Sequence, residues 1–334
     1  MSTIAVLGSG GWGTAMAVLL ANKPGNDVRL WSARPETAVD LNEKRENVRQ
    51  LRGVPIPASV RITADAHIAT QGASIWIEAV PTAYLRGTLE RLAPHCSPEV
   101  SVVSLTKGIE TERFLRPSEI VRECLGVRRV AVLSGPNHAE EIARRLPASA
   151  VVASEDEPFA VTCQELLSND RFRIYTNKDV IGVELAGALK NVMGIAAGLC
   201  DGLKLGDNAK AALLTRGLDE MMRFGVAHQA ERDTFAGLAG MGDLIATCFS
   251  PHGRNRKLGE RLARGESLAS ITSGPQVAEG VNTARSVHRL AQKHGLDLPI
   301  MSAVYRVLEE GQSPLDAVQE LLSRQQKGEG WSLC

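Results

Sequence analysis

Short runs of β-branched and aliphatic residues alternate with amphipathic segments over the first half of the 334-residue chain. Such runs, bounded by glycine, proline or polar residues, predict strands, and the segments between them predict the helices of βαβ units. After about residue 178 the strand pattern stops and long helical patterns fill the rest of the chain. The sequence therefore predicts a parallel α/β domain over residues 1–178 and an all-helical domain over residues 179–334. The expected strands are residues 4–7, 28–31, 75–80, 100–104, 130–133, 150–153 and 171–175.

One of these helical patterns, residues 182–198, is apolar nearly all round and carries a single cation, Lys190, in its middle. A helix that is apolar on every side is expected to be buried, and a buried ammonium group is costly unless a partner or a task accounts for it. Gly194 and Gly198 share a face with Gly187 at helical spacing, so something large must approach that face closely. Lys190 is therefore a candidate proton donor; the alternative is a lysine at the helix edge whose side chain reaches solvent.

The charge balance is neutral, with 38 lysines and arginines against 38 aspartates and glutamates. A neutral balance gives no general attraction to nucleic acid or to a membrane surface, so charge-driven ligand contacts must be local. The six cysteines are scattered, without metal-ligand spacing, and are expected to be reduced thiols with no metal site. No signal peptide and no uninterrupted apolar run of membrane-spanning length are visible, so a cytoplasmic protein without membrane insertion is expected.

The turn after the first predicted strand, residues 8–13, reads Gly-Ser-Gly-Gly-Trp-Gly and matches GxGxxG. In a Rossmann-type domain Gly8 makes the tight turn, Gly10 lets the backbone approach a pyrophosphate, and Gly13 allows close helix packing. The helix N-terminus then faces the anion. Because the strand, the helix and a second strand stand at the right distances, the motif predicts a dinucleotide-binding Rossmann-type domain. A glycine turn without a ligand is the alternative.

The end of the second predicted strand, Trp31-Ser32-Ala33-Arg34, bears on the choice of cofactor. An NAD-specific domain usually carries an acid there to hold the ribose 2′-hydroxyl group, and this chain has none. A small polar residue and a guanidinium group suit a 2′-phosphate, so NADPH is favoured. If Arg34 faces solvent instead, the choice of cofactor stays open.

Two later strand ends carry polar residues at the sheet edge where open α/β folds bind ligands. Lys107 stands beside a glycine and could reach an anionic or carbonyl oxygen, unless it is an ordinary surface lysine. The loop that begins at Gly135 and contains Asn137 could line the same crevice. His138 in this loop is a candidate, and a partly exposed loop histidine is the alternative.

In the helical half, Asp243 lies in a glycine-flanked apolar segment, and Gly253, Arg254 and Asn255 precede a helix expected over residues 258–264. A glycine, a guanidinium group and an amide at a helix start suit a phosphate. A solvated basic turn is the alternative for this second segment.

Taken together, these segments resemble the soluble NAD(P)-dependent glycerol-3-phosphate dehydrogenase family over residues 2 to about 320. The motifs follow the family's order and spacing, and such a set is highly specific: GSGGWGTA, LTKGIE, SGPNHAEE, ELAGALKNV, AGMGDLIATC, GRNRKLGE and QVAEG. The resemblance implies reduction of dihydroxyacetone phosphate to sn-glycerol 3-phosphate for glycerophospholipid synthesis. It also implies a preference for NADPH, with NADH accepted.

The resemblance further implies residue roles, with Lys190 as the catalytic acid/base. Residues implied to bind the substrate are Lys107, Gly135, Asn137, Asn191, Asp243, Thr247, Gly253, Arg254 and Asn255. Residues implied to bind the cofactor are Gly8, Gly10, Gly11, Trp12, Gly13, Arg34, Lys107, Ala139, Arg254, Val277 and Glu279. Two positions depart from the family: bacterial relatives often have Thr or Ser in place of Asn137, and often a basic residue in place of Ala33. The second departure leaves Arg34 to hold a 2′-phosphate.

Ketone reduction needs a hydride donor, an acid for the forming alkoxide, and groups that position the substrate. Two other functions remain open. One is a related reductase of hydroxy or keto acids that shares only the lysine on the helix. The other is a dinucleotide-sensing protein without turnover, against which a buried proton donor argues. A homodimer is also left open.

Overall fold

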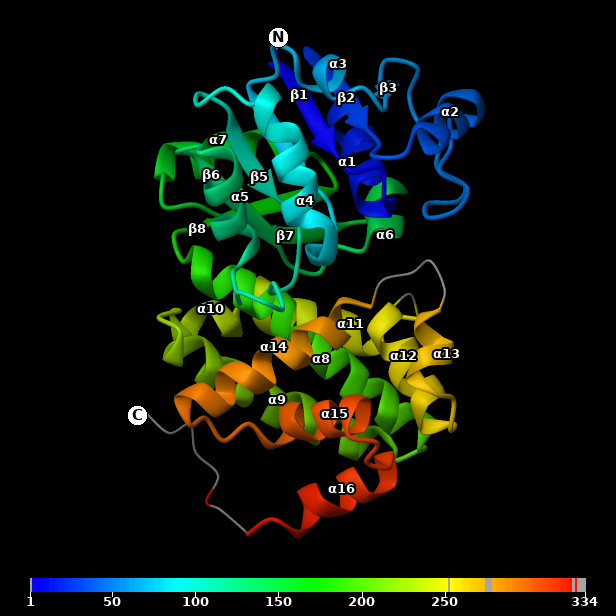
Figure 1. Ribbon diagram of the computed structural model, residues 1–334, viewed down its shortest axis with the longest axis vertical. Helices are drawn as coiled ribbons and strands as arrows, with labels where there is room; N and C mark the ends of the chain where they lie inside the picture. Colours follow the sequence, from blue (N-terminus) through cyan, green and yellow to red (C-terminus); the bar gives the residue numbers. More distant parts are fainter. Residues whose placement is uncertain (1, 252, 274–277, 326–327, 329–334) are drawn as a thin grey trace. The chain divides into compact units, whose positions relative to one another are not determined.

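The computed structural model describes residues 2–251, 253–273, 278–325 and 328 (Figure 1). Its contacts divide the chain into two compact units. Unit 1 comprises the chain up to Lys107 together with Leu115–Glu184, and unit 2 comprises Gly108–Phe114 and the chain from Leu185 onward. The division falls inside a long helix, α8 (Val180–Gly202), after Glu184, whereas the sequence places it after residue 178.

Unit 1 contains one eight-stranded sheet in the order β3-β2-β1-β4-β5-β6-β7-β8. The order reverses beside β1, which pairs with both β2 and β4, and this is the switch point at which open α/β sheets bind ligands. All seven expected strands are present, and β3, which pairs with only three residues of β2, was missed because it is too short to show a pattern. The strands are β1 Ser2–Leu7, β2 Asn26–Trp31, β3 Arg61–Thr63, β4 Ile75–Glu78, β5 Ser101–Ser104, β6 Val130–Ser134, β7 Ala148–Ala153 and β8 Phe172–Asn177.

The expectation of a wholly parallel sheet is wrong at β7 and β8. β6 pairs with β7 in the antiparallel sense, and β7 and β8 are parallel to each other. The connection between β6 and β7 contains only the five-residue helix α6 (Ala139–Ala143), which is about 7 Å long. A six-residue strand is about 20 Å long, so this helix is too short to return the chain to the other end of the sheet.

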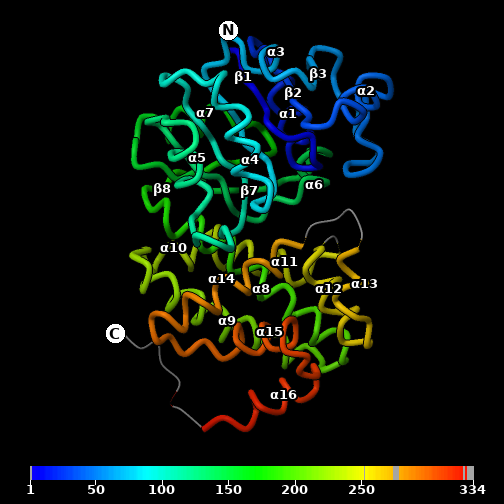
Figure 2. Tube along the Cα trace, in the orientation of Figure 1, coloured from blue at the N-terminus to red at the C-terminus, as the bar shows by residue number. Residues whose placement is uncertain are grey.

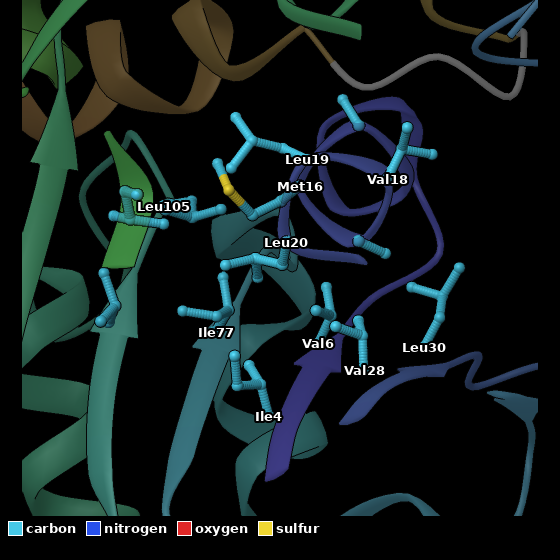
Figure 3. Packing of buried hydrophobic residues seen from close by; sticks show 14 of the residues in the cluster. Ile4, Val6, Met16, Val18, Leu19, Leu20, Val28, Leu30, Ile77 and Leu105 are labelled. Carbon is cyan, nitrogen blue, oxygen red and sulfur yellow. The ribbon is translucent and has the colours of Figure 1, made fainter. Parts of the chain in front are cut away.

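Helices cover both faces of the sheet, each over its own apolar cluster. One cluster joins the sheet to α1, α2, α6 and α7, and the other joins it to α3, α4 and α5. In the first cluster Met16 and Leu20 of α1 pack over Ile4, Val6 and Ile77 of the central strands (Figure 3). The bounds of the helices of unit 1 are α1 Gly11–Ala21, α2 Pro35–Lys44, α3 Ala66–Thr70, α4 Thr82–Leu92, the 3₁₀ turn η1 Ala93–His95, α5 Pro117–Leu125, α6 Ala139–Ala143 and α7 Glu157–Leu167.

From α8 onward the described chain is helical, and the colours of Figure 2 follow it from green to red through unit 2. α8 is long and apolar enough to cross a membrane, which the sequence analysis did not expect, but 94% of its apolar window is buried inside the protein. A buried core helix passes the same test of length and composition. The elements after α8 are α9 Asp207–Ala227, α10 Arg232–Ala236, the π-helical turn η2 Leu238–Gly242, α11 Asp243–Phe249, α12 Arg254–Ala263, α13 Leu268–Thr272, α14 Glu279–His294, α15 Pro299–Glu309 and α16 Pro314–Ser323.

The close approach that the glycines of α8 predict is made by another helix of unit 2, α12. A Cβ atom on Gly198 would lie 1.9 Å from the carbonyl oxygen of Arg256, and one on Gly259 would lie 2.1 Å from that of Ile195. Neither position has room for a side chain, so the two helix backbones are in direct contact. Asp201 near the end of α8 accepts hydrogen bonds from Lys210 and Arg256, at 2.8 and 2.6 Å, which tie α9 and α12 to it.

A buried carboxylate on α9 caps the N-terminus of α15. The two oxygens of Glu220 accept hydrogen bonds from the backbone N–H groups of Ile300 and Met301, at 2.7 and 3.0 Å. Burial raises the pKa of Glu220 from 4.5 to about 7, although both hydrogen bonds act to lower it. A pKa that is higher in the folded than in the unfolded state means that stability falls as the pH rises through that interval.

Glu220→Gln removes this titration. Between pH 4.5 and 7 the contribution of Glu220 to the stability of the parent protein falls, because the unfolded carboxyl group gives up its proton before the folded one. The free energy of unfolding of the variant minus that of the parent should therefore increase by up to roughly 3 kcal/mol over that range. Above pH 7 the difference should stay constant. Hydrogen exchange of the α15 amides, corrected for intrinsic rates, measures it at both ends of the range. An equal difference at pH 5 and pH 8 would contradict the prediction.

Candidate functional site

The glycine-rich turn lies between β1 and α1 at the switch point of the sheet. Gly8 has φ +113°, a conformation that side chains rarely allow, and a Cβ on Gly13 would lie 1.9 Å from the carbonyl oxygen of Gly8. These two glycines therefore make the turn and the close helix packing that the motif predicts. Gly10 is the N-cap of α1 and no side chain caps it. Trp12 packs against the core, and its buried indole N–H has no hydrogen-bond partner in the described chain.

A neighbouring segment, which sequence reasoning did not identify, contacts this turn. The Asn47 amide group donates to the carbonyl oxygen of Ser9 and to the hydroxyl group of Thr14, at 3.0 and 2.9 Å. The exposed side chain of Gln50 accepts a hydrogen bond of 3.0 Å from the Gly11 N–H. A neutral amide oxygen therefore lies at the helix N-terminus where a pyrophosphate is expected to bind.

At the end of β2 the hydroxyl group of Ser32 is buried and Arg34 is exposed. Ser9 donates to the Ser32 hydroxyl at 2.9 Å, and Ser32 donates to the carbonyl oxygen of Arg34 at 3.1 Å. A second guanidinium group, that of Arg91 on α4, lies against the same strand end. It donates to the carbonyl oxygen of Ala33 at 3.3 Å and lies 5.3 Å from the centre of the Trp31 ring.

Lys107 follows β5 in unit 1 and is partly buried. Its ammonium group donates to the Gly135 carbonyl oxygen at 3.1 Å and to the Asn137 amide oxygen at 2.8 Å. The structure therefore brings together three of the implied substrate residues. Asn137 is 9% exposed, and its amide nitrogen is buried without a hydrogen-bond partner in the described chain. His138 is the partly buried N-cap residue of α6, and Ala139 is the first residue of that helix.

The strand end that leads to Lys107 is fastened by Glu78, a buried carboxylate that sequence reasoning also missed. Glu78 is fully buried at the end of β4. It accepts hydrogen bonds from the Ser104 hydroxyl at 2.7 Å, from the Thr106 hydroxyl at 2.8 Å and from the Val80 N–H at 2.5 Å. The turns that follow β4 and β5 are therefore joined by one side chain, which nothing in the pattern of an apolar strand could reveal.

Lys190 is buried in unit 2, with 9% of its side chain exposed, so its side chain does not reach solvent as the alternative reading required. Its ammonium group donates to the Asp243 carboxylate at 3.0 Å and to the Thr247 hydroxyl at 2.6 Å. Both partners are on α11, one helical turn apart, and both are buried. Of the three donors of an ammonium group, one therefore has no partner in the described chain.

Next to Lys190 an amide network joins three helices of unit 2. Asn255 donates to the Asn191 amide oxygen at 2.9 Å, and it accepts from the Gly280 N–H at 3.1 Å. A Cβ on Gly280 would lie 2.8 Å from the Asn255 oxygen, so a glycine is required for this contact. Asn255 is thus a fixed part of the site, and its position depends on the packing of α8, α12 and α14.

The helix expected over residues 258–264 begins earlier, with Arg254 as its first residue and Gly253 as its N-cap. Polar residues in its first turn gave the appearance of a loop, but Asn255 is buried and Arg254 and Lys257 face solvent, as in an amphipathic helix. Glu279 is the first residue of α14 and is partly buried, whereas Val277 lies outside the described residues.

Neither metal ligation nor thiol chemistry is indicated by the described part of the chain. It contains no group of three or more His, Cys, Asp or Glu side chains that could hold a metal ion. The described cysteines are free thiols, and burial raises the pKa of Cys163 and Cys248 to about 12, so neither is a nucleophile near neutral pH.

Comparison with known proteins extends over both units. The family model of the NAD-dependent glycerol-3-phosphate dehydrogenase N-terminus matches residues 3–160, and that of the C-terminus matches residues 179–319. A glycerol-3-phosphate dehydrogenase (NAD(P)+) of Salinibacter ruber is 47% identical over 335 residues, covering 99% of this chain and 98% of the relative. One from Streptomyces griseus is 48% identical over 328 residues, 97% of each chain.

Solved structures agree with the family models. The crystal structure of glycerol-3-phosphate dehydrogenase from Coxiella burnetii has a TM-score of 0.93 and 39% identity, covering 97% of this chain and 99% of that one. A ketopantoate reductase from Ralstonia eutropha, at 14% identity and a TM-score of 0.63, shares the fold alone.

Removal of Asp243 should leave the Lys190 ammonium group buried without its carboxylate. Asp243→Ala is expected to lower the free energy of unfolding of unit 2 by about 3–5 kcal/mol, the usual cost of breaking a buried pair. The matched control is Asp170→Ala, which breaks the pair with Arg145 in which both side chains are more than 60% exposed and should cost at most about 1 kcal/mol. Urea unfolding followed by circular dichroism measures both variants. Equal losses would mean that the Lys190 pair is no different from a surface pair.

Proposed function

The chain belongs to the family of NAD-dependent glycerol-3-phosphate dehydrogenases, and from that premise we propose that it reduces dihydroxyacetone phosphate to sn-glycerol 3-phosphate with NAD(P)H. The observation that carries the proposal is the buried ammonium group of Lys190, which Asp243 and Thr247 hold while its third N–H has no partner among the described residues. In cells the reaction would run mainly toward the alcohol and supply phospholipid precursors.

The residues of unit 1 fit a dinucleotide. Gly10 and Gly11 at the start of α1 have no side chains of their own to keep a pyrophosphate from the helix N-terminus. The amide oxygen of Gln50, which now accepts from Gly11, is a neutral acceptor that a charged phosphate oxygen can replace. We propose NADPH as the preferred cofactor, with NADH accepted, because the end of β2 carries Arg34 and no acid. Trp12, Lys107, Ala139, Arg254, Val277 and Glu279 are the further proposed cofactor contacts.

Lys190 would act as the acid. A bound nicotinamide would supply the hydride for the ketone carbon, and the Lys190 ammonium group would give a proton to the carbonyl oxygen. Asp243 and Thr247 each accept one N–H of Lys190 and thereby fix the direction of the remaining one. In the reverse direction the neutral amine accepts the proton of the alcohol. Positioned proton donors of this kind typically contribute 10²–10⁴-fold to a rate.

The substrate phosphate would bind at the start of α12. Gly253 is buried there as the N-cap, and the exposed guanidinium group of Arg254 follows it. Asn255 and Asn191 hold each other in place and line the same region of unit 2. Lys107, Gly135 and Asn137 are the proposed substrate residues of unit 1, and the unpartnered amide nitrogen of Asn137 is a donor for a substrate oxygen.

The proposed division of labour follows the sequence interpretation: residues 1–178 form the dinucleotide-binding domain, and residues 179–334 form the substrate-binding domain that carries the acid. Each domain also contributes some of the proposed contacts to the other ligand. We further propose a soluble, cytoplasmic enzyme that does not insert into membranes, with a homodimer as its assembly. Gel filtration combined with light scattering tests the assembly directly.

The phosphate of the substrate is the first point to test. NADPH oxidation should be rapid with dihydroxyacetone phosphate and weak with dihydroxyacetone, because the phosphate supplies remote binding energy that aligns the ketone. Initial rates at matched concentrations, followed at the absorbance of NADPH, measure the difference. Equal rates with both ketones would remove the phosphate from the proposal, and turnover of 2-keto acids in its place would favour the related reductase.

Lys190→Ala should lower kcat by about 10²–10⁴-fold and leave NADPH affinity nearly unchanged, because its role lies in the transition state. Steady-state kinetics and fluorescence titration with NADPH measure the two quantities. Lys210→Ala is the matched control, since Lys210 is also a buried lysine paired with a carboxylate, Asp201, in unit 2. A Lys190 variant that stays within a few-fold of the parent rate would show that this lysine is not the acid.

Arg254→Ala should raise KM for dihydroxyacetone phosphate and also lower kcat, since the phosphate helps to align the ketone. The loss of a charge-assisted contact corresponds to roughly 1.5–3 kcal/mol in kcat/KM. Lys257→Ala, which removes another exposed cation from the same helix, is the control. If Arg254→Ala weakened only NADPH binding, the arginine would belong to the cofactor.

A further inference from the structure

Two arginines belong to the surroundings of the end of β2, although the sequence identified only one of them. Arg34 is part of that strand end, and Arg91 is brought to it by α4, fifty-odd residues later in the chain. The hydrogen bond from Arg91 to the Ala33 carbonyl oxygen, at 3.3 Å, places this cation at the residue that precedes Arg34 in the chain. The Trp31 ring beneath it, 5.3 Å away, adds a cation–π contact.

Neither cation is neutralised by the described chain. Arg34 and Arg91 are both exposed, and neither has a carboxylate partner among the described residues. The nearest acids in sequence, Glu36 on α2 and Glu90 on α4, are also exposed and form no ion pair with them. Two cations at one strand end, without a carboxylate partner among the described residues, favour a bound anion.

The hydroxyl group of Ser32 does not supply that anion with a donor. Its single proton is directed to the carbonyl oxygen of Arg34, and its lone pairs face the hydroxyl group of Ser9 and the N–H of Arg34. A hydroxyl group has only one proton to donate. An anion at the end of β2 therefore depends on the guanidinium groups.

We propose that Arg91 is a specificity-determining residue that binds the 2′-phosphate of NADPH together with Arg34. The inference rests on the proposed function only in taking the ligand to be a nicotinamide dinucleotide, whose adenosine ribose lies at the end of the second strand in this fold. Each planar guanidinium group can donate two parallel hydrogen bonds to a phosphate. Arg91 thus supplies, from α4, a second cation at a strand end whose own sequence carries only Arg34.

The test uses adenosine 2′,5′-bisphosphate and adenosine 5′-monophosphate, which differ only in the 2′-phosphate. Arg91→Ala should weaken binding of the bisphosphate on the order of ten-fold, as measured by calorimetry, and leave binding of the monophosphate unchanged. Arg34→Ala should act in the same way, and the double variant should lose nearly all discrimination between the two. Arg86→Ala is the matched control, because this arginine lies on the same helix but is paired with Glu123 at 3.3 Å.

The kinetic counterpart separates this proposal from the proposed function. With dihydroxyacetone phosphate, Arg91→Ala should raise KM for NADPH on the order of ten-fold and leave KM and kcat with NADH unchanged. The role of Arg91 would be overturned if Arg91→Ala bound the bisphosphate within two-fold of the parent affinity, or if the parent did not discriminate between the two nucleotides. In either case, NADH-dependent reduction of dihydroxyacetone phosphate would still support the dehydrogenase. If the parent binds the bisphosphate more tightly than the monophosphate but does not reduce dihydroxyacetone phosphate, the 2′-phosphate contact stands and the proposed reaction is wrong.

Discussion

The burial of one ammonium group inside an apolar helix is the constraint on which unit 2 depends. A cation in such surroundings is tolerated only if oxygen atoms replace its water. Asp243 and Thr247 supply those oxygens from α11, so α11 must pack against α8 at the level of Lys190. The neighbouring turn of α8 then meets α12, and the amide network of Asn191, Asn255 and Gly280 brings in α14. The charge of Lys190 thus fixes how α8 meets α11, and the amide network beside it fixes how α8 meets α12 and α14.

Much of this could be predicted from the sequence, because the signals are local. The glycine turn, the strands with their flanking helices, and the apolar helix around Lys190 each lie within about twenty consecutive residues, where hydrophobic periodicity and turn chemistry act. The family resemblance added residue roles, and the structure brings the implied residues Lys107, Gly135 and Asn137 into contact in unit 1. In unit 2 it does the same for Lys190, Asp243 and Thr247.

What the sequence could not predict depends on residues that are distant along the chain. The antiparallel pairing of β6 and β7 follows from the length of α6, which a pattern places only to within a few residues. Glu78 interrupts an apolar strand, and apart from the nearby Val80 N–H its donors come from the end of β5 and the turn that follows it. Gln50 and Arg91 are ordinary polar residues of exposed segments, and only the fold brings them to the glycine turn and to the end of β2. Periodicity carries no information on such contacts.

The contact of α8 with α12 has a consequence for how this protein tolerates change. Gly198 and Gly259 carry no chemistry, yet any side chain at either position would force the two backbones apart. Such a shift would move Asn255 away from Asn191 and alter a polar site without touching any of its side chains. In random mutagenesis of unit 2, glycines such as Gly198 and Gly259 should therefore be among the positions that tolerate substitution least. A search confined to polar residues would miss them.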